Sequence, residues 1–309
     1  MSSVLSTHYS LVYDEAQVKQ FYELFAAPLL VKSETTLRND EKETTTNVPL
    51  LQDRVMVFLL LAREKYLRHN DNTTTIRFTE NNLHLPRTLI SRYDPEEFLK
   101  LLKRYEVPFG CYTYEDEKKQ AHPLPNESLV IYFDLQVKST LQAFNKLSKS
   151  IQDNLAALVQ EVAPTETSYN LCRIQSDLLS QIHASNATAL NVPQYLDLDV
   201  DTKDRTILQS FVQAVWCSIE QAIRVIIETH GGFHIVLNKS EMKSAHNKCL
   251  HDFLRDPRMK LIAVNCNGQP CTKTHISLVK NPMVPLPGTK QGGFPVKMWT
   301  ASDFLTLYC

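Results

Sequence analysis

The sequence lacks any apolar run that could cross a membrane: the longest covers residues 55–62, whereas a spanning helix needs about 20 apolar residues. The N-terminus also lacks the basic-then-apolar order of a signal peptide, and the acids Asp14 and Glu15 argue against a transit peptide. We therefore expect an intracellular protein, located in the nucleus, the cytoplasm or an organelle, that is not secreted and has no membrane partner.

The cysteines do not have the pattern of a disulfide framework, because they are odd in number, at seven, and are scattered between Cys111 and Cys309. Five potential zinc ligands lie close together in the sequence: His246, Cys249, His251, Cys266 and Cys271. Their cysteines do not have the C-x₂-C spacing of structural zinc sites. We therefore expect reduced thiols and do not expect zinc as a cofactor.

A strong overall charge is absent as well, since 33 Lys and Arg face 34 Asp and Glu and the formal net charge is −1. The whole molecule therefore has no basic field that would attract nucleic acid. The distribution is uneven, because residues 238–298 hold ten Lys and Arg against three acids, a local charge of +7. A basic segment suits phosphate-bearing substrates, although solvated surface lysines give the same count.

Glycine is scarce, and five of the seven glycines fall in two short segments, at Gly231, Gly232, Gly288, Gly292 and Gly293. Glycine permits a positive φ and a close approach of another group to the main chain. These segments are therefore either tight turns or places where a ligand comes near the backbone.

Residues 195–201 read Tyr-Leu-Asp-Leu-Asp-Val-Asp and predict a β-strand. Side chains alternate between the two faces of a strand, so Asp197, Asp199 and, if the strand continues, Asp201 share one face. Neighbouring carboxylates raise one another's pKa unless a cation lies between them, and their oxygens are the ligands that Mg²⁺ and Mn²⁺ prefer. The pattern favours a divalent metal site.

Two other acidic motifs are excluded by spacing. An EF-hand loop requires Gly at its sixth position and Glu at its twelfth, where this chain has Thr202 and Leu208. A phosphatase that forms an aspartyl phosphate needs Thr or Val two residues after its D-x-D, and neither Asp197 nor Asp199 as first residue provides it. The alternative that stays open is a strand end whose acids are solvated and cap the next helix.

A β-hairpin is predicted after this strand, because two β-branched runs at residues 224–228 and 233–237 flank a turn with Gly231 and Gly232. His234 lies at the start of the second run, opposite in direction to its apolar neighbours. It is either a structural histidine or, beside the acidic strand, a phosphate or nucleotide contact.

A strand that ends in D-h-D, where h is apolar, followed by a helix and a hairpin with small-Gly-x-His, resembles the first two motifs of the archaeo-eukaryotic primase superfamily. Residues 284–293, Val-Pro-Leu-Pro-Gly-Thr-Lys-Gln-Gly-Gly, are similar to the segment that follows its third motif. The resemblance implies that Asp197 and Asp199 are catalytic and bind two Mg²⁺ or Mn²⁺ ions. It also implies that His234 contacts the phosphates of the incoming nucleotide.

One departure from the family concerns its third motif, which supplies a further acidic metal ligand before the Pro-Gly segment. Residues 274–285 contain no carboxylate. Either Asp201 or a distant acid such as Asp134 completes the metal site, or the chain is a degenerate member.

The predicted fold class is α+β, with a mainly helical region at residues 1–125 and a primase-like α/β core with a small, largely antiparallel sheet at residues 126–309. Apolar periodicity predicts helices in the first region at residues 14–30, 50–68 and from Asp94 onward, with a mobile linker at about 33–47. Strands are predicted at residues 128–135 and 260–264, and long helical patterns at 139–162 and 166–184.

The leading functional hypothesis is a primase-polymerase-like nucleotidyltransferase that adds nucleotides to a 3′-hydroxyl on a template, with Lys239, Lys290 and Lys297 assisting His234 in nucleotide binding. Its partners are nucleoside triphosphates and nucleic acid, and a protein subunit is a further possible partner. The alternatives are a degenerate primase-fold subunit that binds nucleic acid or protein, and a metal-dependent hydrolase that uses the same acids.

Overall fold

The computed structural model describes residues 8–30, 53–64, 66, 83, 85–116, 118–159, 180–182, 194–255, 260–264, 270–279 and 282–308. The linker expected at about 33–47 lies outside these residues, as does most of the helix expected at 166–184. The described elements form a mixed α+β fold with mostly small antiparallel sheets, which confirms the predicted fold class.

A five-stranded antiparallel sheet has the strand order β11-β6-β8-β7-β15. Its strands are β6 (Tyr195–Val200), β7 (Ile223–Glu228), β8 (Phe233–Asn238), β11 (Ile276–Val279) and β15 (Lys297–Trp299). Without the edge strand β15, the order along the chain is strand, helix, two strands, helix, strand, which is the split βαβ arrangement of ferredoxin-like folds. The predicted acidic strand and the predicted hairpin are thereby confirmed as β6 and as β7 with β8.

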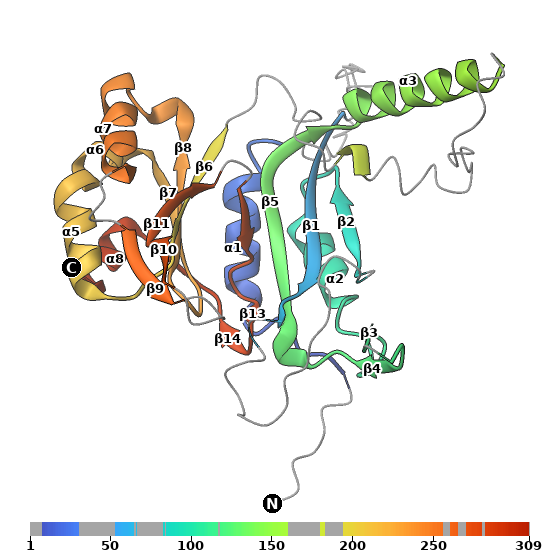
Figure 1. Ribbon diagram of the computed structural model, residues 1–309, viewed down its shortest axis with the longest axis horizontal. Coiled ribbons are helices and arrows are strands. Elements are labelled where there is room, and N and C mark those ends of the chain that lie inside the picture. Colours follow the sequence, from blue (N-terminus) through green and yellow to red (C-terminus); the bar gives the residue numbers. More distant parts are fainter. Residues whose placement is uncertain are drawn as a thin grey trace, which may run out of the picture.

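Helices cover one face of this sheet (Figure 1). They are α5 (Arg205–Phe211), a π-helical turn η6 (Val212–Trp216), α6 (Cys217–Ile219), the 3₁₀ turn η7 (Glu220–Ala222), α7 (Ser244–Leu254) and α8 (Ala301–Tyr308). Leu198 and Val200 of β6 pack beneath them with Phe211 and Phe304. The alternate residues of β6, which include its acids, therefore face the other way.

A second sheet has the order β12-β5-β1-β2 and joins segments from distant parts of the chain. Its strands are β1 (Arg54–Ala62), β2 (Arg87–Ile90), β5 (Leu129–Ser139) and β12 (Met283–Pro285). The 3₁₀ turn η3 (Asn126–Ser128) precedes β5. Helix α2 (Pro95–Lys103) begins as predicted, because the Asp94 carboxylate accepts a hydrogen bond from the backbone N–H of Glu97 at 2.9 Å.

The helix predicted at residues 50–68 is wrong, because this segment contains the strand β1. Met56 and Phe58 pack into the main core on one face of β1, while Val55 and Val57 pack into a smaller cluster on the other. A strand buried on both faces has a continuous apolar run, which the periodicity of a sequence cannot distinguish from a buried helix.

Helix α1 (Glu15–Ala26) lies between the two sheets (Figure 1). On one side the ring of Phe21 packs edge-on against Phe133 of β5, with ring centroids 5.6 Å apart. On the other side Phe25 packs edge-on against Tyr195 of β6, with centroids 5.0 Å apart. The apolar stripe predicted from the sequence is thus buried in a core shared by both sheets.

The remaining elements are short or lie outside the two sheets. They are the hairpin β3 (Thr113–Glu115) and β4 (Ala121–Pro123), α3 (Thr140–Val159), η8 (Lys239–Glu241), the hairpin β9 (Lys260–Val264) and β10 (Pro270–Thr274), and the short pair β13 (Lys290–Gln291) and β14 (Phe294–Pro295). Helix α3 projects from the end of β5 (Figure 1). Within the described residues, no helix combines the length and the apolar character that crossing a membrane requires.

The turn at Pro287 and Gly288 is hydrogen-bonded to the residues that precede α1. The carbonyl of Gly288 accepts hydrogen bonds from the backbone N–H groups of Tyr13 at 2.9 Å and Asp14 at 3.1 Å. Gly288 has a φ of +82°, and a Cβ atom placed on it would lie 2.3 Å from the carbonyl oxygen of Asp14. Only glycine therefore fits at this contact, directly before α1.

We expect Gly288→Ala to lower the free energy of unfolding by at least about 2 kcal/mol, because it adds a backbone clash to the strain of a positive φ. Gly110 is the matched control, since its φ is +95° but a Cβ atom there would meet nothing within 4 Å. Gly110→Ala should therefore cost only the strain of about 1 kcal/mol. Urea unfolding measures both variants, and equal losses would show that the contact with Asp14 is unimportant.

Candidate active site

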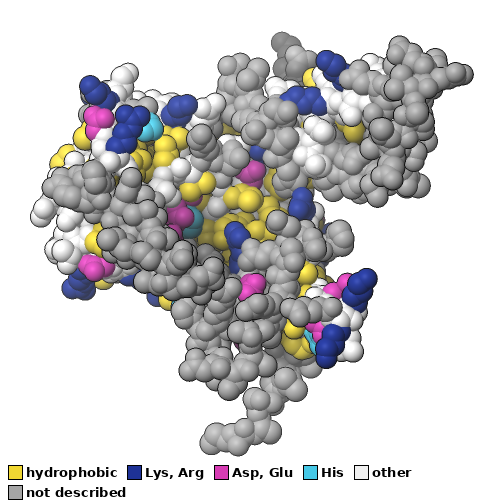
Figure 2. All heavy atoms as spheres, in the orientation of Figure 1, with side chains coloured by type: hydrophobic (Ala, Val, Ile, Leu, Met, Phe, Trp, Pro, Cys, Tyr) yellow, Lys and Arg dark blue, Asp and Glu magenta, His cyan; other side chains and the backbone are white. Residues whose placement is uncertain are grey.

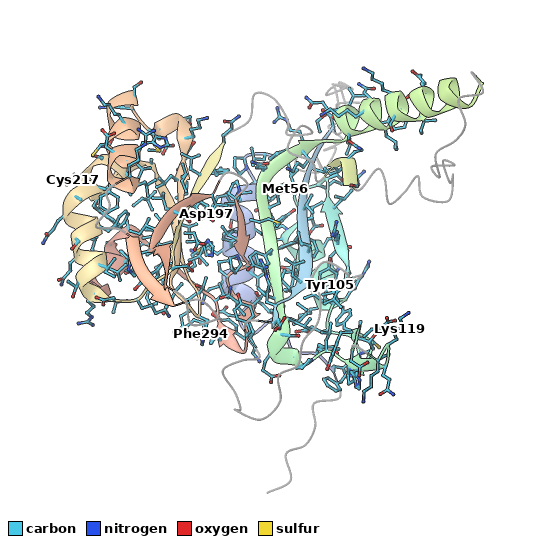
Figure 3. The ribbon with its side chains drawn as sticks, in the orientation of Figure 1. Met56, Tyr105, Lys119, Asp197, Cys217 and Phe294 are labelled. Carbon is cyan, nitrogen blue, oxygen red and sulfur yellow. The ribbon has the colours of Figure 1, made fainter. Side chains whose placement is uncertain are left out.

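The acids of β6 face the gap between the two sheets. Tyr195, which shares their face, packs against α1, whereas Leu198 and Val200 face the helices on the opposite side. Asp197 lies accordingly on the side of the five-stranded sheet that faces β5 (Figure 3). The alternation predicted for this strand is therefore confirmed, and it directs the carboxylates into the middle of the molecule.

Asp197 is fully buried, with 0% of its surface exposed. Its Oδ2 lies 2.9 Å from Nδ1 of His234 in a hydrogen bond. Its Oδ1 is buried and has no hydrogen-bond partner among the residues that the structure describes. A buried carboxylate oxygen without a partner costs about 1–3 kcal/mol or more, and a bound cation is one kind of group that would offset this cost.

His234 lies between the two acids of the motif. It is the cross-strand neighbour of Asp199, and its Nε2 is 3.9 Å from Oδ1 of Asp199. Burial alone would lower the pKa of the imidazole, but the charge and hydrogen bond of Asp197, with the charges of Asp199 and Asp201, raise the pKa above its ordinary value. The structure thus brings together the histidine and the acids that the sequence singled out.

Two candidates for a third acid have different surroundings. Asp201 follows β6, is exposed, lines the same pocket, and its backbone N–H donates to the carbonyl of His275 at 2.7 Å. Asp134 of β5 is buried, and its Oδ2 lies 3.4 Å from Nζ of Lys138. Burial raises the pKa of Asp134 despite the opposing charge of Lys138, and Asp134 is not among the residues that line the pocket.

The strand next to the acids is uncharged. In the antiparallel register of β11 with β6, Ser277 pairs with Asp199 and Val279 pairs with Asp197. Directly opposed residues on one face have Cβ atoms about 4.5–5.5 Å apart. A carboxylate at either position would thus stand beside the acids, and the chain has a hydroxyl and an isopropyl group there instead.

The pocket in front of the acids has a volume of about 430 Å³ and is lined by both sheets. Figure 2 shows acidic and histidine side chains side by side near the middle of the face that it draws, between the two sheets. The wall opposite the acids contains Arg63, Tyr66, Tyr132 and Met283. The rest of the lining is Val279, Thr229, His230, Gly231 and Gln291.

The opposite wall was not predicted from the sequence. Arg63 directly follows β1. Because the apolar run of β1 was predicted to be a helix, the position of Arg63 at the end of a strand was not predicted. Tyr132 lies within a buried strand that was predicted, but nothing in the sequence indicates that β5 faces β6. A polar residue directly after a long apolar run, here Arg63 after Ala62, is the signal that would have found it.

The three lysines predicted to bind the nucleotide do not line this pocket. Lys239 lies beyond the far end of β8, where its Nζ is 3.3 Å from Oε1 of Gln194. Lys290 contacts Ser10 at 3.3 Å, and Lys297 is exposed on the edge strand β15. The structure therefore does not bring them together with Asp197, Asp199 and His234.

The donor set suits a hard divalent cation. Among the described residues, no three or more His, Cys, Asp or Glu side chains are arranged to surround one ion. Mg²⁺, however, is commonly bound by one or two carboxylates, with water and substrate phosphates as the other ligands. Asp197, with its unpartnered oxygen, and Asp199 fit that mode of binding, and the cation itself remains a proposal.

Three of the five potential zinc ligands lie wholly or in part outside the described residues. Cys266 lies outside the described residues, as do the side chains of His246 and Cys271. Cys249 on α7 is a free thiol, as are Cys111 and Cys217.

Comparison of the chain with family models, with curated proteins and with solved structures finds no match. The resemblance to primases therefore rests on the sequence motifs alone.

The turn between β7 and β8 provides a test of how the histidine is positioned. A Cβ atom on Gly232 would lie 1.8 Å from the carbonyl oxygen of Val200 at the end of β6, whereas one on Gly231 would meet nothing within 4 Å. We expect Gly232→Ala to cost about 2–4 kcal/mol in urea unfolding, because β6 and β8 must separate. Gly231→Ala should stay within about 0.5 kcal/mol, and a similar loss in both would contradict the close approach.

A carboxylate added to β11 tests whether the acids of β6 bind a divalent cation. We expect Ser277→Asp to lower the stability of the metal-free protein through repulsion by Asp199 and to tighten Mn²⁺ binding by about tenfold, as measured by calorimetry. Ser210→Asp, which adds the same charge at an exposed position of α5 on the helical side, is the control. If both variants bind Mn²⁺ equally, the position beside Asp199 does not reach the ion.

Proposed function

We propose that this chain is a metal-dependent nucleotidyltransferase of the primase-polymerase type, which transfers nucleotides to a 3′-hydroxyl on a nucleic-acid template. The observation that supports it most is the fully buried Asp197, whose Oδ1 has no hydrogen-bond partner in the described part of the chain. Asp197 lines a pocket together with Asp199 and His234. Protein interiors avoid such groups unless a function requires them.

Asp197 and Asp199 would hold the cation, since their carboxylates share one face of β6. When bound, Mg²⁺ or Mn²⁺ ions make a 3′-hydroxyl more nucleophilic and offset the negative charge that develops on the α-phosphate. The rigid sheet on which both acids lie keeps their oxygens in position for that charge before the substrate arrives.

His234 would hold the phosphates of the incoming nucleotide. Its Nδ1 is engaged with Asp197, so Nε2 is the ring nitrogen that is left to donate to a phosphate oxygen. Because Nε2 also lies near Asp199, the phosphate would be held beside the acids that bind the cation. The imidazole is oriented by the same residue that carries the metal, which couples the two parts of the site.

A second candidate function is a degenerate primase-fold subunit that binds nucleic acid or a protein partner without catalysis. The uncharged residues Ser277 and Val279 opposite the acids favour it, because they leave the neighbouring strand without a metal ligand. The partners of such a subunit would be nucleic acid or a protein, whereas the nucleotidyltransferase would bind nucleoside triphosphates and nucleic acid, with a protein subunit as a further partner. A metal-dependent hydrolase acting through the same acids is the third reading.

Primer extension on a single-stranded template with Mn²⁺ or Mg²⁺ tests the proposal. We expect Asp197→Asn to reduce incorporation by more than about 100-fold, and the thermal stabilisation by Mn²⁺ to disappear with it, since a ligand stabilises the fold that binds it. Asp252→Asn, which removes an exposed carboxylate on α7, is the control and should keep both properties.

Three other results would have distinct meanings. Full incorporation by Asp197→Asn would remove the assignment of these acids. Salt-sensitive binding of single strands by the unmodified chain without any incorporation would favour the non-catalytic subunit. Release of nucleotides without extension would indicate a hydrolase.

A further inference from the structure

The wall of the pocket opposite the acids contains a positively charged side chain, that of Arg63. Arg63 is the first residue after β1, and its backbone N–H donates to the carbonyl of Ser128 at 2.8 Å. This bond fixes the point from which the side chain enters the pocket. Within the described part of the chain, no other Lys or Arg lines this pocket.

The ring of Tyr132 contacts the guanidinium of Arg63. Its Cζ lies 5.5 Å from the ring centroid of Tyr132, within the range of a cation–π interaction. Tyr132 itself is buried in β5, where its neighbours in the sheet are Leu59 and Pro285. Tyr66 lines the same pocket, and burial with the nearby Tyr132 raises the pKa of its phenol, while the charge of Arg63 opposes that rise.

The pocket thus has walls of opposite charge. Asp197, Asp199 and Asp201 line it from the five-stranded sheet, and Arg63 lines it from the four-stranded sheet. A ligand that satisfies both walls needs several anionic oxygens in a row, some to bind a cation held by the acids and others to meet the guanidinium. A polyphosphate chain has this chemistry, and Arg binds phosphate through two parallel N–H groups.

We propose that Arg63 is an anion-binding residue for the phosphate chain of the substrate, and that Tyr132 positions its guanidinium. The inference rests on the proposed function for the identity of the substrate, a nucleoside triphosphate, but the anion site itself does not. Arg63 takes the role for which the sequence suggested Lys239, Lys290 and Lys297, none of which lines the pocket. Substrate binding would therefore require residues from both sheets.

Calorimetric titration of the full chain with ATP and, separately, with inorganic triphosphate, each in the presence of Mn²⁺, tests the proposal. We expect Arg63→Gln to weaken the binding of both ligands by about 10- to 100-fold, the loss typical of a charge-assisted hydrogen bond. Arg63→Lys should recover part of the loss, because it restores the charge but not the paired N–H groups. Arg54→Gln removes the same charge from the exposed first residue of β1 and should bind like the unmodified chain.

The positioning role of Tyr132 has its own pair of variants. Tyr132→Phe keeps the ring and should retain most of the affinity, whereas Tyr132→Leu removes the cation–π contact and should weaken triphosphate binding by about fivefold. Urea unfolding of every variant identifies losses that come from misfolding, and Arg63→Lys and Tyr132→Phe are the changes that best preserve the packing.

The outcomes separate this inference from the proposed function. If Arg63→Gln and the unmodified chain bind both ligands equally, or if neither ligand binds at all, the anion site is overturned. If primer extension also persists in Arg63→Gln, the nucleotidyltransferase proposal stands without the anion site. If inorganic triphosphate binds through Arg63 but no nucleotide is incorporated, the anion site stands and the nucleotidyltransferase proposal fails.

Discussion

The burial of α1 between two sheets is the constraint on which the rest of the structure depends. Phe21 and Phe25 project from neighbouring turns of the helix and pack against Phe133 of one sheet and Tyr195 of the other. Burying each ring contributes about 1.5–3 kcal/mol, and both contacts must form together because the helix is one rigid rod. The helix therefore sets the distance between the sheets, and with it the width of the pocket in which the acids of β6 face Arg63.

The buried acid Asp197 lowers the stability of the fold that contains it. Asp197 is buried beside a second carboxylate, and the hydrogen bond with His234 satisfies only one of its oxygens in the described part of the chain. A leucine or valine at this position would match the apolar character of the surrounding core. Sites that bind charged ligands commonly carry this kind of local strain, which the larger apolar core offsets.

Elements with a local pattern could be predicted from the sequence. The alternation around Asp197 and Asp199 and the glycines before His234 predicted a strand and a hairpin, and both are present. The strand β1 was predicted as a helix, because a strand buried on both faces has no alternation of apolar and polar residues. The pairing of Ser277 with Asp199, and the position of Arg63 in the same pocket as the acids, depend on contacts between segments far apart in the chain, which no local pattern encodes.

The route of the chain after β11 has a mechanical consequence. β11 ends at Val279 in the five-stranded sheet, β12 begins at Met283 in the four-stranded sheet, and β15 returns to the first sheet at Lys297. The chain thus passes from the five-stranded sheet to the four-stranded sheet and back, and so connects the two sheets beside the pocket. Because only residues 280–282 separate β11 from β12, the two sheets cannot move far apart at this point without disrupting one of these strands. A ligand of the pocket would therefore have to fit the existing spacing of the sheets.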